Sequence, residues 1–401
     1  MATIIRQSYI DKIERYLGKE TIIVLVGQRR VGKSCMMKMI RDRKMADDGN
    51  NIIYIDKEKR EFDNIQTYQD LNDYIGLYFQ SDKHNYILID EIQDIKEFER
   101  SIRSYRTDPN TDIIITGSNA RMLSNELSTL IGGRYKEIYI QSLSYKEFLE
   151  FHQLSDNDEA LALYIQYGGL PGLAKIGLEE DDAREYQMDI YHTVLLKDVI
   201  MRNQIRNVPF LENLVRFLAD NTGKLISANS ISKYMKSQGE SIASAAITNY
   251  ISFLCEAYIL HKVNRYDIHG KRIFETNDKF YFEDNGIRNA IAGGTREGDI
   301  EKVIENIIYQ NLIRLGYQVY VGQLQAGEID FVCTKPGGER IYVQASYIIA
   351  DDATREREFG NLRAIKDNYP KYVISMTPLL TKNDDDGITH LHLRKFLTEG
   401  I

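Results

Sequence analysis

The sequence of 401 residues has few cysteines and no apolar run near the roughly 20 residues of a membrane-spanning helix. Cys35, Cys255 and Cys333 lie far apart and have no His or Cys nearby at ligand spacing. This excludes a disulfide framework and a structural zinc site. The opening residues, MATIIRQSYIDKIERY, carry both charge signs and lack the apolar segment of a secretory signal. We therefore expect a cytoplasmic protein that is not embedded in a membrane.

Composition places the chain among globular proteins, with 43% hydrophobic and 27% charged residues. Its length predicts two or three domains of about 100–200 residues each. The net charge of −8 argues against a protein that coats nucleic acid by bulk electrostatics. A local basic patch that contacts DNA is still compatible with this charge.

The first part of the chain alternates short apolar runs with segments long enough for helices. The runs are TIIVLV (21–26), NIIYID (51–56), YILID (86–90), DIIITG (112–117) and KEIYI (136–140). Such alternation predicts an α/β fold, with a parallel sheet covered by helices on both faces. We assign residues 1–150 to this domain.

Three further regions follow. Residues 151–206 read as helical and are broken by the turn GGLPG at 168–172, whereas 207–292 show three helices and then two strands joined at His269 and Gly270. That order predicts a winged helix-turn-helix. A Gly-rich linker spans 292–299. Residues 298–401 read as helix, three strands, helix and strand, a separate small α/β domain.

A phosphate-binding loop is the clearest motif. GQRRVGKS, residues 27–34, matches GxxxxGK[ST] and lies between a strand and a helix, as the mechanism requires. Gly27 and Gly32 let backbone amides face the phosphates of ATP, Lys33 is expected to bridge the β- and γ-phosphates, and Ser34 to ligate Mg²⁺. The predicted nucleotide contacts are Gly27, Gln28, Arg29, Arg30, Val31, Gly32, Lys33, Ser34 and Cys35, with Ser118 from a later strand.

Acids and amides at other strand ends complete this predicted site. Asp90 closes YILID and is the expected magnesium partner, while Glu91 is placed to orient and deprotonate the attacking water. Ser118 and Asn119 follow the fourth strand and are candidates for sensing the γ-phosphate. The alternatives are a solvated acid at Glu91 and ordinary turn residues at 118–119.

At this point the chain resembles the AAA+ branch of P-loop ATPases, and within it a prokaryotic family that joins such a domain to a C-terminal nuclease-like domain of unknown function. The motifs that carry the resemblance are GQRRVGKS, LIDEIQ, TGSNARML, GGRYKEI, LSYKEF, YGGLPG, KDVIMR, KFYFEDNGIR and EIDFVC. The resemblance implies a homo-oligomer in which an arginine reaches the neighbouring subunit's γ-phosphate. Arg134 matches that position and Arg121 is second, against the alternative of a surface arginine that caps a turn.

Basic residues outside the loop have two interpretations. Lys197, Arg202 and Arg206 are placed to face nucleotide or DNA, or to form a solvated helix face. The expected recognition helix, about 241–255, has no charged residue and only Asn249 to read bases, so sequence-specific readout is not expected. The expected wing carries His261, Lys262, Arg265, His269, Lys271 and Arg272. These suit contact with DNA phosphates, and a structural or oligomer-contact role is the equal alternative.

The C-terminal region resembles the PD-(D/E)XK nuclease core, whose acids bind metal. The resemblance implies tentative metal ligands at Glu305 and Asp330, with Gln344 in the third place, but Ser346 stands where that core has a lysine. Arg355 or Arg357 is the candidate substitute cation. We expect a degenerate or regulatory nuclease fold, and polar packing is the alternative for both acids.

These observations lead to one function and two rivals. The expected function is a Mg²⁺-dependent ATPase that couples ATP hydrolysis to a DNA-associated or macromolecular partner. The rivals are a slow nucleotide-gated switch and an ATP-regulated, metal-dependent nuclease.

Overall fold

Two compact units make up the chain. The computed structural model describes residues 4–120, 133–240, 242–273, 277–294, 297–325, 327–378 and 384–401. The first unit is Met1–Gln141 with Glu256–Tyr258, and the second is Ser142–Cys255 with Ile259–Ile401. No helix in the described ranges is both long and apolar enough to cross a membrane.

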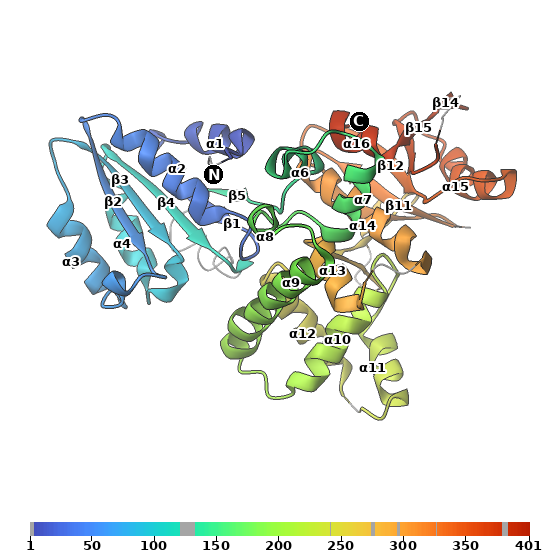
Figure 1. Ribbon diagram of the computed structural model, residues 1–401, viewed down its shortest axis with the longest axis horizontal. Coiled ribbons are helices and arrows are strands. Elements are labelled where there is room, and N and C mark those ends of the chain that lie inside the picture. Colours follow the sequence, from blue (N-terminus) through green and yellow to red (C-terminus); the bar gives the residue numbers. More distant parts are fainter. Residues whose placement is uncertain are drawn as a thin grey trace. The chain divides into compact units, whose positions relative to one another are not determined.

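The first unit is built on a five-stranded parallel sheet (Figure 1). Its strands are β1 (Ile22–Val26), β2 (Asn50–Asp56), β3 (His84–Asp90), β4 (Thr111–Gly117) and β5 (Tyr135–Tyr139). They lie in the order β2-β3-β4-β1-β5, and every neighbouring pair is parallel. All strands expected from the apolar runs are present, and the predicted parallel sheet is confirmed.

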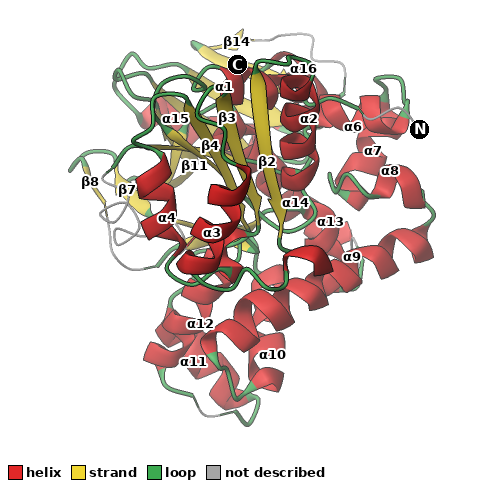
Figure 2. Cartoon of the chain, turned by 90° about the vertical axis from the view of Figure 1, so that its left-hand side faces the viewer, coloured by secondary structure: helices red, strands yellow, loops and turns green. Residues whose placement is uncertain are grey.

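Helices cover both faces of this sheet. α1 (Gln7–Glu14) and α2 (Lys33–Met45) pack on one face, while α3 (Tyr68–Tyr78) and α4 (Phe98–Tyr105) pack on the other. Figure 2 shows α2 on the opposite side of β2 from α3 and α4. Every residue of β1 and β4 is buried, as expected for strands between two helical layers. Two short 3-10 helices, η1 (Arg60–Phe62) and η2 (Ile92–Asp94), follow β2 and β3.

The second unit begins with a helical segment, as expected for 151–206. Its helices are α6 (Tyr145–His152), α7 (Asp158–Tyr167), α8 (Leu173–Ile176), α9 (Glu180–Val194) and the π-helix η4 (Leu195–Met201). Ser144 and Glu147 cap α6 reciprocally, which satisfies two amides at its amino end. The predicted turn at 168–172 separates α7 from α8.

Segment 207–292 contains three helices followed by strands, in the expected order. Its elements are α10 (Val208–Asp220), α11 (Ala228–Ser237), α12 (Ser244–Glu256), β6 (Leu260–Val263), β7 (Arg265–Asp267), β8 (Arg272–Ile273), β9 (Lys279–Phe282) and α13 (Asn285–Ala292). β6 and β9 form an antiparallel pair, whereas β7 pairs with β8 and also with a strand of the C-terminal region. β7 and β8 therefore extend the C-terminal sheet, which the sequence did not indicate.

The C-terminal region contains the predicted succession of helix, three strands, helix and strand. Its elements are η5 (Glu297–Asp299), α14 (Ile300–Arg314), β10 (Gln318–Gln323), β11 (Glu328–Thr334), β12 (Arg340–Ala345), α15 (Asp352–Ala364), β13 (Lys371–Ser375), β14 (Asp384–Asp385), β15 (Ile388–His392) and α16 (Leu393–Glu399). These strands form an eight-stranded sheet together with β7 and β8 of the preceding segment. The order is β14-β15-β13-β12-β11-β10-β7-β8.

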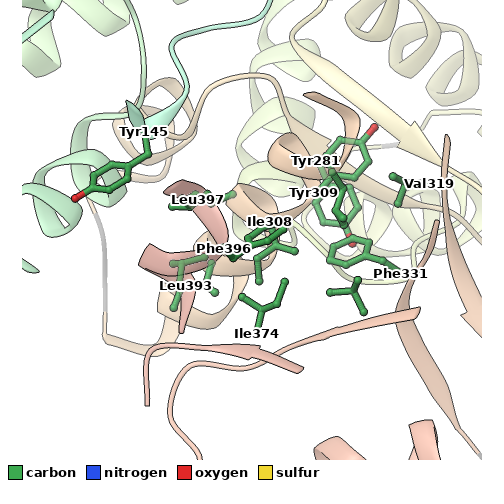
Figure 3. Close-up of a cluster of buried hydrophobic side chains, with 14 of the residues drawn as sticks. Tyr145, Tyr281, Ile308, Tyr309, Val319, Phe331, Ile374, Leu393, Phe396 and Leu397 are labelled. Carbon is green, nitrogen blue, oxygen red and sulfur yellow. The ribbon is translucent and has the colours of Figure 1, made fainter. Parts of the chain in front are cut away.

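One aromatic cluster joins β9 to this region. The ring of Tyr281 on β9 stacks on Tyr309 of α14, with centroids 4.5 Å apart, and both rings lie near Phe331 of β11 (Figure 3). The same core includes apolar residues of α6, α7 and α16. Elements far apart in the sequence therefore share one hydrophobic core in the second unit.

Candidate functional site

The phosphate-binding loop connects β1 to α2 at the carboxyl edge of the first unit's sheet. Gly27 has φ +141°, and a Cβ built there would lie 2.1 Å from the carbonyl oxygen of Ile140. Gly32, with φ +103°, occupies the position before the first residue of α2. Both positions require glycine, because other residues disfavour this backbone region and position 27 has no room for a side chain.

The side chain of Lys33 points back into the loop. Its Nζ donates to the carbonyl oxygens of Gly27 and Gln28 at 2.8 and 2.9 Å, and the residue is 4% exposed. The amino end of α2 supplies free amides next to this ammonium group, an arrangement that favours an anion such as phosphate.

The other loop residues have distinct surroundings. Arg29 lies 3.8 Å from Glu58, Arg30 has φ +68°, and Cys35 is exposed. Val31 is buried, and its carbonyl oxygen accepts from Arg6 at 3.1 Å. Arg6 also donates to the carbonyl oxygen of residue 141 at 2.8 Å, so it ties the loop to the end of the first unit. No pattern in the sequence indicated this support.

Asp90 meets the loop at the end of β3. Its carboxylate hydrogen-bonds Ser34 and accepts from Thr116 Oγ1 at 2.5 Å. Burial raises the pKa of Asp90, although these hydrogen bonds oppose the shift. The structure therefore brings together the two residues predicted to hold Mg²⁺, and a serine hydroxyl beside a carboxylate suits that ion.

Glu91 is held in a fixed position one residue further on. It has φ +55°, its amide donates to Thr116 Oγ1 at 2.9 Å, and its Oε2 accepts from Ser118 at 3.2 Å. Gln93 donates to the same oxygen. Asn119 is buried beside Ser118. Glu91 and Ser118, which follows β4, thus share one corner of the site.

Two further residues belong to this edge and were not identified from sequence. Thr116 contacts both Asp90 and Glu91. Asp56 ends β2 in register with Asp90 and is 5% exposed. The signal for Asp56 was available, because it closes NIIYID just as Asp90 closes YILID.

Arg134 lies at the opposite, amino edge of the sheet. Its carbonyl oxygen accepts from the amide of Ile22, the first residue of β1, and the residue is exposed. It lines a hollow of about 480 Å³ together with Lys19 and Lys136. The five residues of β1 span roughly 16 Å, so Arg134 is too far away to reach the loop of its own chain. Arg121 lies outside the described residues.

The YGGLPG and FEDNGIR motifs meet each other in the second unit. A Cβ at Gly168 would lie 2.5 Å from Asp284 Oδ1, and one at Gly286 would lie 2.0 Å from the carbonyl oxygen of Tyr167. These glycines allow the turn after α7 to approach the start of α13. Of the basic residues in KDVIMRNQIRN, Arg202 lies 3.6 Å from Asp198, while Lys197 and Arg206 are exposed.

Several basic residues of the expected wing have partners within the chain. His261 contacts Glu283 at 2.7 Å, and Lys262 contacts Asp278 at 3.0 Å. Arg265 contacts Gln323, and Arg272 lies 3.6 Å from Asp267. His269 and Lys271 are exposed. Because these partners include carboxylates, the charge offered to a phosphate is smaller than the sequence indicated.

The tentative C-terminal metal ligands also come together, but around a cation of the chain itself. Lys279 Nζ lies 2.8 Å from Glu305 and 3.0 Å from Asp330. Of the two candidate substitute cations, Arg357 pairs with Glu358 at 2.8 Å and Arg355 lies over the Phe359 ring, and their substitute role stays a prediction. Lys279 was not identified from the sequence as the partner of these acids, because it lies in the preceding segment. Among the residues described, no group of three or more His, Cys, Asp or Glu is arranged to hold a metal ion.

Comparisons with known proteins place the first unit in a family. Residues 19–149 match the family described as an AAA domain, and residues 158–298 match a domain of unknown function (DUF8612). An uncharacterized protein of Haemophilus influenzae is 33% identical over 99% of both chains. An uncharacterized protein of Methanocaldococcus jannaschii is 26% identical over 88% of this chain and 81% of its own.

A similar fold occurs in a solved structure, a Walker-type ATPase of Pyrococcus abyssi. The TM-score is 0.51, with 14% identity over 72% of this chain and 96% of that one. The family match and this fold support the predicted AAA-type P-loop domain. They give no support to the winged-helix or nuclease-like resemblance, and both stay hypotheses.

Proposed function

Because this chain belongs to a family of AAA-type P-loop ATPases, we propose that it hydrolyses ATP with Mg²⁺ and couples hydrolysis to a macromolecular partner. The observation that carries the proposal is the meeting of Ser34 with Asp90, next to Lys33 and Glu91, at one edge of the sheet. Lys33 and Ser34 begin α2, and Asp90 and Glu91 lie at the end of β3, which supports a phosphate-binding site together with an acid for water.

Each residue has a role that its position supports. The loop amides and Lys33 bind the phosphates, and Ser34 with Asp90 would hold Mg²⁺, which neutralises phosphate charge when bound. Glu91 orients the attacking water and takes its proton, while Thr116 holds its backbone amide and Ser118 holds its carboxylate. Asn119 is positioned beside them to sense the γ-phosphate.

Arg134 completes the site of a neighbouring subunit. Its place at the amino edge of the sheet keeps it away from its own loop, and an always-charged guanidinium suits contact with phosphate oxygens. This role requires a homo-oligomer. We therefore propose that the ATPase works as an assembly of identical subunits in the cytoplasm.

DNA is the macromolecular partner that the exposed basic residues of the chain suit. His269 and Lys271 are exposed next to β8, and both suit phosphate contacts that carry no sequence information. The neighbouring basic residues already contact acids or amides of the chain. We therefore propose that any DNA contact is weak, non-specific and sensitive to salt.

Two variants test the chemistry. Lys33→Ala should abolish ATP binding, because the phosphates lose their buried cation. Glu91→Gln should bind ATP and hydrolyse it at least about a hundredfold more slowly, the scale expected for a lost general base. Glu99→Gln, at a half-buried acid on α4, is the matched control and should hydrolyse ATP at the native rate. Unchanged hydrolysis in Glu91→Gln would remove this residue from the mechanism.

The coupling is tested by steady-state ATP hydrolysis with and without double-stranded DNA at several salt concentrations. Multiple turnover that DNA accelerates supports the proposed partner. A slow rate that DNA leaves unchanged argues against DNA and supports the nucleotide-gated switch.

A further inference from the structure

A buried lysine forms the centre of a group of carboxylates in the second unit. Lys279, the first residue of β9, has a side chain that is 4% exposed. Its Nζ lies 2.8 Å from Glu305 Oε1, 2.7 Å from Glu328 Oε1 and 3.0 Å from Asp330 Oδ1. We call these three acids the carboxylate cluster. One ammonium group therefore connects β9 to both α14 and β11.

The carboxylate cluster is held by further hydrogen bonds. Tyr281 donates to Glu305 Oε1 at 2.6 Å, and the amide of Ala345 donates to Asp330 Oδ2 at 3.0 Å. The stacked rings of Tyr281 and Tyr309 fix this hydroxyl from one side (Figure 3). These contacts hold Glu305 and Asp330 independently of Lys279. Hydrogen bonds from the rest of the chain therefore position the carboxylate cluster together with its cation.

The electrostatics favour a permanently charged ammonium. Burial lowers the pKa of Lys279, but the attraction of Glu305, Asp330 and Glu328 outweighs this and leaves the pKa well above its usual value. Burial raises the pKa of Glu305 to about 7, against the opposing effect of Lys279. Three carboxylates around one buried cation leave an excess of negative charge. In other proteins, such an excess of carboxylate charge attracts a divalent ion.

The distances within the carboxylate cluster suit an ammonium group better than a metal ion. Three carboxylate oxygens lie 2.7–3.0 Å from one point, slightly longer than the roughly 2.0–2.6 Å of oxygens around Mg²⁺ or Ca²⁺. The ammonium group donates to Glu305 and Asp330, and it forms an ion pair with Glu328.

We propose that the Lys279 ammonium takes the position of a divalent cation in the carboxylate cluster and so attaches β9 to the C-terminal sheet while closing the cluster to metal. A metal ion entering this position would have to displace a buried cation from three oxygens, because two cations at one point repel each other. This inference concerns the second unit and does not depend on the proposed ATPase.

The test compares full-length variants without nucleotide. The variants are native chain, Asp330→Asn, Lys279→Met, Lys279→Arg and Lys279→Met/Asp330→Asn. Thermal unfolding is followed in EDTA and in 1 mM Mn²⁺, and Mn²⁺ binding by calorimetry. Lys279→Met removes the charge but keeps the length of the side chain, whereas Lys279→Arg keeps the charge.

Native chain and Asp330→Asn should respond identically to Mn²⁺. Lys279→Met should melt at least about 5 °C lower in EDTA, because uncompensated carboxylates stay buried, and Lys279→Arg should lose less. Mn²⁺ should raise the melting temperature of Lys279→Met by several degrees and leave that of the double variant unchanged. The proposal is overturned by Mn²⁺ binding to native chain that Asp330→Asn abolishes, or by Lys279→Met that is unaffected in EDTA or unresponsive to Mn²⁺.

A second measurement uses the native chain alone and so does not depend on whether variants fold. Amine acetylation followed by mass spectrometry should modify the exposed Lys271 and leave Lys279 protected, with or without 1 mM Mn²⁺. Labelling of Lys279 that matches Lys271, or that rises when Mn²⁺ is added, would show that the ammonium is not the resident cation.

Discussion

The amide of Gly169 donates to Asp284 Oδ2 at 2.8 Å and joins two motifs that are 115 positions apart in the sequence. The other oxygen of the same carboxylate accepts from the amide of Ile287 and so caps α13. Leu143 closes the turn from the far side, since its amide donates to the carbonyl oxygen of Gly169 at 2.6 Å. Asp284 is thus the central acceptor of a joint between α7 and α13.

Asp284 should make stability depend on pH. Burial raises its pKa from 3.8 to about 6, so its proton binds more tightly in the folded state. Protonated Asp284 contributes about 3 kcal/mol to the free energy of unfolding. This contribution is complete below about pH 3.8 and is lost as the pH rises through about 6. Urea unfolding of native chain and Asp284→Asn between pH 4 and 7 measures this. The native chain should lose more stability over that range, and equal slopes would contradict the assignment.

The close approach at Gly286 should not tolerate a side chain. Gly286→Ala places a Cβ 2.0 Å from the carbonyl oxygen of Tyr167, and the backbone at that point has little freedom to move. We expect a loss of about 1–3 kcal/mol, roughly 3–10 °C in Tm. Gly298→Ala is the matched control, because a Cβ there meets nothing within 4 Å. Circular dichroism melting should separate the two variants, and equal Tm values would show that the turn moves freely.

Thr116 should matter for ATP hydrolysis because its hydroxyl bonds the Asp90 carboxylate and the Glu91 amide. Thr116→Val removes the hydroxyl that bonds both acids while it keeps the shape of the side chain. We expect hydrolysis to slow by about tenfold to a hundredfold, as for the loss of buried hydrogen bonds. Thr116→Ser keeps the hydroxyl and should stay near the native rate. If both variants lose the same activity, the methyl group rather than the hydroxyl is what matters.

Arg134 should act on the neighbouring subunit. Mixing Arg134→Ala with Lys33→Ala subunits should restore some ATP hydrolysis, because some interfaces then combine an intact loop with an intact arginine. Lys33→Ala mixed with Glu91→Gln is the control and should stay inactive, since neither subunit has a complete loop and acid. A mixture of Arg134→Ala and Lys33→Ala that assembles but stays inactive would show that the arginine does not act across subunits.

Much of the first unit could be predicted because its signals are local. Each expected strand is a short apolar run, and Lys33, Asp90 and Glu91 lie at or after the carboxyl ends of these runs, whereas Arg134 precedes one. Parallel strands bring these ends to one edge, so Lys33, Asp90 and Glu91 were expected to meet. Asp56 was missed although it closes NIIYID as Asp90 closes YILID, and the register of β2 and β3 pairs these two acids.

The central contacts of the second unit could not be predicted from local sequence patterns. Glu305 and Asp330 were identified as a pair, but their cation was sought in the helix that follows them in sequence. Lys279 reaches them because β9 packs against α14 and β11 through the rings of Tyr281, Tyr309 and Phe331. Nothing in the spacing of the residues indicates that contact.

Local order along the chain was enough to specify the phosphate loop, since Gly27, Gly32, Lys33 and Ser34 are adjacent and their backbone geometry allows few arrangements. Pairing between distant segments was decided by folding alone. Gly169 with Asp284, and Lys279 with the carboxylate cluster, depend on which surfaces bury one another. Burial strengthens such contacts by removing water, and the sequence does not record which partner a buried charge will find.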